Sequence, residues 1–223
     1  GYSNSLFVSE NNIYMVYQKQ VDQRDIFERI LVEVIMPALP PDVADEIRSI
    51  QDSDKSENRK MGEIQLAMQE WFEEIGPEEA AKFQQSLQEK YDQIYAEISK
   101  EMEKSVAHKI SISNGNIEYK TKGEVPGQPL NQFSMDENNG YFRIATTTND
   151  FSGRGSSLNH LYVLDENMNI VGKVEDLAKG ERIFSARFIG DRAYLVTFVR
   201  IDPLFVIDLS DPQNPRVLGE LKI

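Results

Sequence analysis

The stretch Asn131–Ala145, NQFSMDENNGYFRIA, decides the fold, because it reads as two short strands joined by a tight polar turn. The same pattern occurs at Ser5–Tyr17 (SLFVSENNIYMVY) and at Ser185–Phe198 (SARFIGDRAYLVTF). The aligned positions are Ile13, Tyr141 and Ala193, then Tyr14, Phe142 and Tyr194, then Val16, Ile144 and Val196. A hairpin used three times predicts a repeat architecture.

Each copy is followed by a second hairpin, which completes a four-stranded unit. These hairpins are His108–Val125, His160–Leu177 and Pro203–Ile223, and we align them at His108, His160 and Pro203. A unit of four antiparallel strands that recurs about every 40 to 50 residues is typical of a β-propeller, in which each unit is one blade. The sequence therefore predicts all-β propeller blades, each a four-stranded antiparallel sheet, and three blades are too few to close a ring.

A long segment interrupts the first unit only. From the second strand to the third, the aligned distance is 10 residues in the third unit (193 to 203), 19 in the second (141 to 160) and 95 in the first (13 to 108). A long connection is tolerated there because loop-closure entropy grows slowly with length. We therefore expect a partial propeller with a large α-helical insertion, an α+β chain overall.

The expected organisation has five parts. Residues 1–21 form the first two strands of blade one, 22–105 the acidic helical insertion, 106–127 the last two strands of blade one, 128–180 blade two, and 181–223 blade three.

The insertion shows apolar residues at spacings of three and four, which predict about four amphipathic helices. One helix ends at Gly76 and the next begins at Pro77, since glycine favours the end of a helix and proline its first turn. The last helix should bury a seam formed by Ala80, Phe83, Leu87, Tyr91, Ile94, Ile98 and Met102.

Charge excludes several partners. The chain has 24 Lys plus Arg against 37 Asp plus Glu, net −13, and residues 22–105 carry −11 of it, from 21 acidic and 10 basic residues. Such a surface repels phosphate groups, so we expect no nucleic-acid partner.

Zero cysteines exclude disulfides and thiolate catalysis, and two histidines do not suggest a multi-histidine metal centre. The sequence contains no run of 18 apolar residues, so we expect no membrane-spanning helix. The first ten residues lack the pattern of a signal peptide.

Two segments resemble a known family. Arg182–Ile223, and less closely His160–Glu181, are similar to the secreted proteins with a carboxy-terminal β-propeller domain distantly related to WD40 repeats. Asp202–Pro215, DPLFVIDLSDPQNP, is the most specific part. The resemblance implies a propeller fold, a secreted or cell-surface location and a longer parent protein. It implies no established activity, so it supplies no catalytic residues.

The residue types that could carry chemistry have simpler structural interpretations. His108 and His160 occupy aligned positions in successive units, which favours a structural role over a convergent reactive pair. The turns 165–169 and 208–214 favour side-chain-capped turns over calcium loops. Glu73, Glu74 and the acids that follow them, Glu78 and Glu79, favour a solvated face over a general acid–base pair. We therefore predict no catalytic residue, no cofactor and no metal.

Three residues remain as candidate partner contacts. Trp71 and Phe72 straddle the apolar stripe of their helix, so one is expected in the core and the other can serve as an exposed anchor. Arg154 lies in the small-residue loop NDFSGRGSSLN, residues 149–159, which reads as a mobile loop able to contact a ligand.

The sequence favours a non-enzymatic interaction or scaffolding module outside the cytoplasm, with a protein or small-molecule partner that it does not identify. One alternative is a fragment of a propeller hydrolase or cofactor-dependent dehydrogenase whose active site lies on other blades. Another is a regulatory cap, in which the helices move aside to admit a ligand. The unpartnered faces of the first and last blades also predict self-association.

Overall fold

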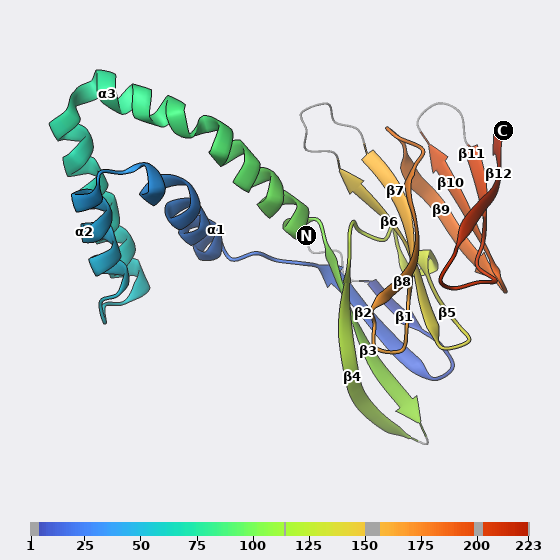
Figure 1. Ribbon diagram of the computed structural model, residues 1–223. Coiled ribbons are helices and arrows are strands. Elements are labelled where there is room, and N and C mark those ends of the chain that lie inside the picture. The colour runs from blue at the N-terminus through green and yellow to red at the C-terminus, as the bar shows by residue number, and fades with distance from the viewer. Residues whose placement is uncertain (1–4, 114, 150–156, 199–202, 223) are drawn as a thin grey trace. The chain divides into compact units, whose positions relative to one another are not determined.

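The computed structural model describes residues 5–113, 115–149, 157–198 and 203–222 (Figure 1). The chain divides into two compact units. A β-rich unit comprises Gly1–Gln20 and Ser99–Ile223, and a helical unit comprises Val21–Ile98.

The β-rich unit contains three four-stranded sheets, and within each sheet neighbouring strands are antiparallel and follow the order of the chain. Sheet A consists of β1 (Ser5–Val8), β2 (Asn12–Gln18), β3 (Ser105–Ser113) and β4 (Asn116–Val125). Sheet B consists of β5 (Met135–Asn138), β6 (Tyr141–Asn149), β7 (Ser157–Leu164) and β8 (Ile170–Leu177), after a short 3₁₀ turn at Gln132–Ser134. Sheet C consists of β9 (Arg182–Ile189), β10 (Arg192–Phe198), β11 (Pro203–Asp208) and β12 (Arg216–Lys222). The predicted fold class, a partial propeller with a helical insertion, is confirmed.

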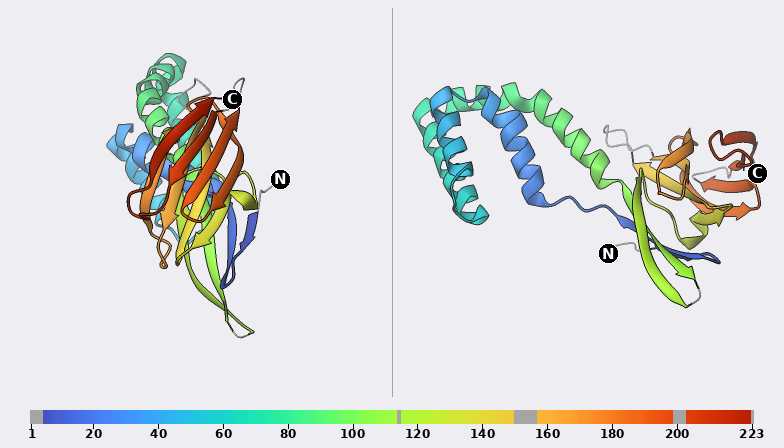
Figure 2. Two further views of the ribbon diagram at one scale, coloured as in Figure 1. Left: turned by 90° about the vertical axis from the view of Figure 1, so that its right-hand side faces the viewer. Right: turned by 60° about the horizontal axis from the view of Figure 1, so that its bottom comes forward.

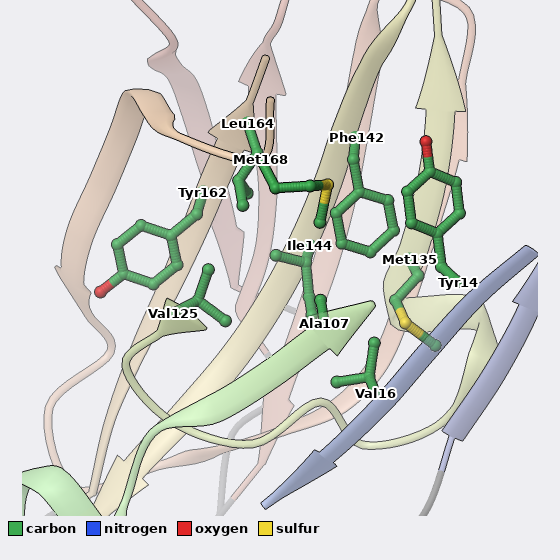
Figure 3. Packing of buried hydrophobic residues seen from close by; sticks show 10 residues of the cluster. All are labelled: Tyr14, Val16, Ala107, Val125, Met135, Phe142, Ile144, Tyr162, Leu164 and Met168. Atoms are coloured by element: carbon green, nitrogen blue, oxygen red, sulfur yellow. The ribbon is translucent and has the colours of Figure 1, made fainter. Parts of the chain in front are cut away.

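The three sheets pack face to face, with sheet B in the middle (Figures 1 and 2). Tyr14 of sheet A stacks on Phe142 of sheet B with ring centroids 4.2 Å apart (Figure 3). The next residues along β6 alternate between faces, so Ile144 packs toward sheet A and Ala145 toward sheet C. Sheet B therefore buries apolar side chains on both faces.

The turns correct the alignment made from the sequence. Two residues connect the strands of the first hairpin in all three sheets, which makes Asn12, Tyr141 and Arg192 equivalent. The alignment of Tyr141 with Ile13 was therefore wrong by one residue. The reason is that both hairpins share the letters ENN, but the turn lies at 10–11 in sheet A and at 139–140 in sheet B.

The two histidines are consequently not equivalent. His108 pairs with Met15, and the matching pair in sheet B is Tyr162 with Ile144. His160 lies two residues away from that position. The repeated placement on which the sequence argument for the histidines depended is therefore wrong, and their roles follow from their contacts, described below.

Two glycines allow close approach between successive sheets. A Cβ on Gly123 of β4 would lie 2.2 Å from the carbonyl oxygen of Met168, in the turn between β7 and β8. A Cβ on Gly172 of β8 would lie 2.1 Å from the carbonyl oxygen of Pro212, in the turn between β11 and β12. Sheets A and B thus each receive the outer turn of the next sheet against a glycine of their last strand.

The helical unit lies between β2 and β3 in the chain. It comprises α1 (Gln23–Ile30), which Asp22 caps, a π-helical turn at Leu31–Ile35, a 3₁₀ turn at Met36–Ala38, and α2 (Pro41–Gln51). The last element is α3 (Glu57–Met102), which is broken at Gly76. The sequence prediction of a helix end at Gly76 and a new start at Pro77 is confirmed.

Part of the predicted seam of the last helix is exposed. Ile94 and Ile98 are buried with Val34, as the spacing predicts. Tyr91, however, is 39% exposed and stacks on Tyr95. Met102, at the end of the helix, is 41% exposed.

An ion-pair network joins the two chain segments that lead into and out of the insertion. Lys19 donates to Glu101 at 2.8 Å and to Glu124 at 2.9 Å, which raises the pKa of Lys19. Lys104 pairs with Glu101 as well, and the backbone N–H of Lys19 donates to the carbonyl of Lys104 at 2.7 Å. The insertion therefore begins and ends at a closed, hydrogen-bonded neck.

The break in α3 depends on a conformation that only glycine adopts readily. Gly76 has φ 78° and ψ 168°, and no atom of the described residues lies within 4 Å of the position that a Cβ would occupy, so the effect of a side chain there is conformational. We expect Gly76→Ala to lower the free energy of unfolding of the helical unit by about 1–3 kcal/mol. Urea titration followed by Trp71 fluorescence measures this.

Gly62 is the matched control, because it lies in the same helix without a positive φ and also has open space around it. Gly62→Ala should raise the stability by about 0.5–1 kcal/mol, since alanine has the higher helix propensity. Equal effects of the two substitutions would contradict the role assigned to Gly76.

Contact between sheets B and C depends on the absence of a side chain at Gly172. Because an added methyl group would overlap the carbonyl of Pro212, we expect Gly172→Ala to destabilise the β-rich unit by about 1–3 kcal/mol. The loss is measured by chemical denaturation followed by circular dichroism of the sheets. An unchanged midpoint would show that the two sheets are not packed as described.

Candidate binding groove

The helical unit contains two separate clusters of buried apolar residues, one larger than the other. Leu31, Ile47 and Ile64 are the centre of the larger cluster. The π-helical turn separates the two, because Val34 packs with Ile94 and Ile98 in the smaller cluster while Leu31 stays in the larger one.

An open groove of about 640 Å³ follows the larger cluster across the break in α3. Its lining is mostly apolar and comes from α1, from the π-helical turn and from both sides of Gly76. The lining residues are Phe27, Leu31, Ile35, Ile64, Gln65, Met68, Gln69, Phe72, Glu73, Gly76, Pro77 and Ala80. A volume in this range is typical of ligand-binding grooves.

A second hollow of about 330 Å³ continues the groove, since the two share Phe27, Leu31 and Ile64. The second hollow is more polar, and Arg24, Glu28, Gln51, Glu57 and Lys60 contribute to it. One end of the combined surface is thus apolar and the other end is charged.

Three aromatic rings hold the two halves of α3 together beside the groove. Trp71 meets Phe83 edge to face with centroids 4.8 Å apart, and Phe72 lies 5.9 Å from the same ring. Trp71 and Phe72 are both half-buried, but only Phe72 lines the groove. Such edge-to-face contacts stabilise the angle at Gly76, which keeps the groove open.

The surroundings of the groove are acidic. Glu73 lies on its wall and Glu28 at its polar end, and both are exposed. The unit 21–98 has 19 acidic and 8 basic residues, and 8 of the acids form ion pairs, which leaves 11 without one. Arg29, for example, donates a hydrogen bond to Glu33 and lowers the pKa of Glu33. Glu73, in contrast, accepts a hydrogen bond from the neutral side-chain amide of Gln69.

The two histidines are held by structural hydrogen bonds in different sheets. His108 lies between Tyr17 and Tyr119, whose hydroxyls are 3.0 and 3.2 Å from its ring nitrogens. His160 contacts the hydroxyl of Thr148 at 2.9 Å, and burial lowers its pKa. Both rings are thus hydrogen-bonded within their own sheets, and in the described part of the chain they do not contact each other, which supports a structural role.

In the acidic turns, the aspartate side chains cap backbone N–H groups of the same turn. Asp165 accepts from the N–H groups of Asn167 and Asn169 at 2.9 and 2.8 Å. Asp208 accepts from Ser210, and this bonding lowers the pKa of Asp208 to about 2. The interpretation of 165–169 and 208–214 as capped turns is confirmed. Within the part of the chain that the structure describes, no three His, Asp or Glu side chains are grouped to hold a metal ion.

The sequence anticipated part of this site. It singled out Trp71 and Phe72, which the structure places beside and in the groove. It also singled out Arg154, which lies outside the described residues. It missed Phe27, Leu31 and Met68, whose apolar spacing was read only as core.

Comparison with known proteins agrees with the sheet architecture. The family described as beta propeller domain matches residues 1–223. An uncharacterised protein of Methanocaldococcus jannaschii is 39% identical over 223 residues, all of this chain and 35% of the relative. An uncharacterised protein of Archaeoglobus fulgidus is 36% identical over 219 residues, 98% of this chain and 34% of the relative. The chain thus spans about a third of the length of these relatives.

The described helices include none that is long and apolar enough to cross a membrane. Three consecutive four-stranded sheets, together with a family match over the full length, lead to one conclusion: the chain belongs to the beta propeller domain family.

Proposed function

We propose that the chain is a non-enzymatic interaction module in which the groove of the helical unit binds a basic amphipathic helix of a partner protein. The groove carries this proposal, because it is an open apolar surface of about 640 Å³ on a unit of strongly negative charge.

The shape of the groove suits a helix. Its walls come from two helical segments, with Leu31 and Ile35 on one side and Met68 and Phe72 on the other. Pairs four residues apart on each wall form parallel apolar ridges, and a third helix can pack between such ridges. Amphipathic helices bind protein grooves in this way through anchors at positions i, i+3, i+4 and i+7.

The charge of the unit selects a basic partner. Eleven acids of the unit have no ion pair, and two of them, Glu28 and Glu73, lie at the edges of the groove and make its potential negative. An acidic helix would be repelled, whereas lysines beside the apolar face of a partner helix would meet carboxylates.

The β-rich unit acts in this proposal as a scaffold that presents the helical unit. Propellers are rigid, and their connecting segments often carry recognition while the sheets do not change. The location outside the cytoplasm is also part of the proposal. It is supported by the resemblance of Arg182–Ile223 to the propeller domains of secreted proteins.

The location has its own test. Cells that express the natural full-length protein are fractionated, and an antibody raised against this chain is used to locate it. Accessibility of the protein to protease added outside intact cells is the expected result. Protein found only in the cytoplasmic fraction would contradict the proposed location.

Peptide binding tests the groove. The probe is a designed helical peptide of leucine and lysine, with leucines at spacings of three and four, and its counterpart carries glutamate in place of lysine. Trp71 is the only tryptophan and packs on Phe72, so its fluorescence reports binding. We expect the leucine–lysine peptide to bind, with affinity that falls as salt is added, and the leucine–glutamate peptide not to bind.

Substitution of Phe72 locates the binding. Phe72→Ala removes a ring from the wall and should weaken the peptide about tenfold, or about 1.4 kcal/mol. Tyr95→Ala is the matched control, because Tyr95 is an exposed aromatic residue of the same helix that does not line the groove. Equal binding of both peptides, or equal effects of the two substitutions, would contradict the proposal.

A further inference from the structure

We propose that the partner helix lies in the groove in one direction, antiparallel to both walls, with its N-terminal end beside the break in α3 and its C-terminal end in the polar hollow. The polar hollow is the second hollow of about 330 Å³ described above. The inference rests on the proposed function, because it names which basic helix this groove accepts. That partner has its lysines in the first half of the helix and a last turn without excess positive charge.

The two walls of the groove run in the same direction. On the first wall, Arg24 of α1 lines the polar hollow and Ile35 of the π-helical turn lines the apolar groove. On the second wall, Lys60 of α3 lines the polar hollow and Phe72 lines the apolar groove. Residue numbers therefore rise from the polar hollow toward the break on both walls, and Figure 1 shows α1 and the first half of α3 rising together. Parallel walls give the groove a direction.

The helix starts at the polar hollow favour one end of an occupant. The first turns of α1 and α3 lie at this hollow, and the first N–H groups of a helix carry a partial positive charge. The last carbonyl groups of an occupant helix carry a partial negative charge and meet the positive charge there. An occupant in the opposite direction brings a third positive helix start to the same place. The dipoles of the walls therefore favour an antiparallel occupant.

The charged side chains at the polar hollow do not oppose this preference, because they balance each other. Arg24 pairs with Asp22 at 2.7 Å, and Lys60 pairs with Glu57 at 3.2 Å. The charged residues that line the hollow are two cations, Arg24 and Lys60, and two anions, Glu28 and Glu57. The lining thus has no net charge, so it does not draw the lysines of the partner to this end.

The other end of the groove is acidic without compensation. Residues 69–79, on both sides of the break, include five glutamates and no lysine or arginine. Glu73 lies on the groove wall, with Glu70 and Glu74 within one helical turn of it. All three are exposed, and none forms an ion pair with another described residue. Lysines in the first half of an antiparallel occupant lie beside these carboxylates, within the screening length of about 8 Å.

The two ends of the groove therefore select the same direction through different forces. A helix with its lysines in the second half can place them near Glu73 only if it lies parallel to the walls, and then its ends face like partial charges. If it stays antiparallel, its lysines lie at the neutral end. Either arrangement loses one of the two favourable interactions.

Energy transfer from Trp71 measures the direction. Trp71 is the only tryptophan and lies close to Gly76 in the chain, near the acidic end of the groove. The probe is the leucine–lysine peptide at a length of about 18 residues, with both ends blocked and with nitrotyrosine as the acceptor at its first or its last position. The two ends of such a helix are about 27 Å apart. We expect the first-position label to quench Trp71 at least about twofold more than the last-position label at saturation.

The outcomes separate this inference from the proposed function. Stronger quenching by the first-position label supports both. Saturable binding with equal quenching, or with stronger quenching by the last-position label, overturns the direction and leaves the proposed function standing. Failure of both labelled peptides to bind overturns the two together.

Lysine placement tests the charge pattern of the partner. Two peptides share their leucines and their composition, but one has lysines in its first half and glutamines in its second, and the other has the reverse. We expect the first to bind about threefold to tenfold more tightly at low salt. Lysines stabilise a free helix near its C-terminus, so the stability of the free peptides favours the opposite order and does not explain this result. Equal affinities, or tighter binding of the second peptide, would overturn the inference.

A substitution at Glu73 tests the position of the lysines. Glu73→Gln removes the charge beside the groove and keeps the size of the side chain, so it should weaken the peptide with first-half lysines about twofold to fivefold. Glu89→Gln is the matched control, because Glu89 is an exposed acid of the second half of α3 that lines neither hollow. It should leave the affinity unchanged. Equal affinities of the two variants would show that the lysines do not lie beside Glu73, and the proposed direction would fail.

Discussion

Burial of both faces of sheet B is the constraint on which the packing of the β-rich unit depends. Sheet B meets it within the chain, with Phe142 and Ile144 against sheet A and Ala145 and Leu161 against sheet C. Sheets A and C each bury one face against sheet B, so sheet B contributes to both apolar cores of the unit. The order of the sheets therefore follows from local hairpins, and their stability follows from their neighbours.

Local signals explain why the sheets could be predicted from the sequence and why their register could not. The Asn139-Gly140 turn has φ values of 51° and 83°, which suit a two-residue hairpin, so the strands on either side were clear. The first hairpin turns at 10–11 without glycine, and the shared letters ENN then aligned the wrong residues. A shift of one residue exchanges the two faces of a strand, so hydrogen bonds were needed to identify which residues face sheet B.

The helical unit was predictable in its parts and not in its groove. Spacing of apolar residues gave the helix faces, and Gly76-Pro77 gave the break, because both are local properties of the chain. The groove spans the break in α3, and the contact of Trp71 with Phe83 joins the two halves of that helix across the break. No pattern in the sequence states that contact, so the lining residues were read as ordinary core.

Charge is divided unequally between the two units. The helical unit carries −11 and the β-rich unit −2, from 18 acidic and 16 basic residues. Two helical units repel each other, which disfavours occupation of the groove by a second copy. The excess negative charge therefore lies in the unit that holds the groove, where a basic partner is proposed to bind.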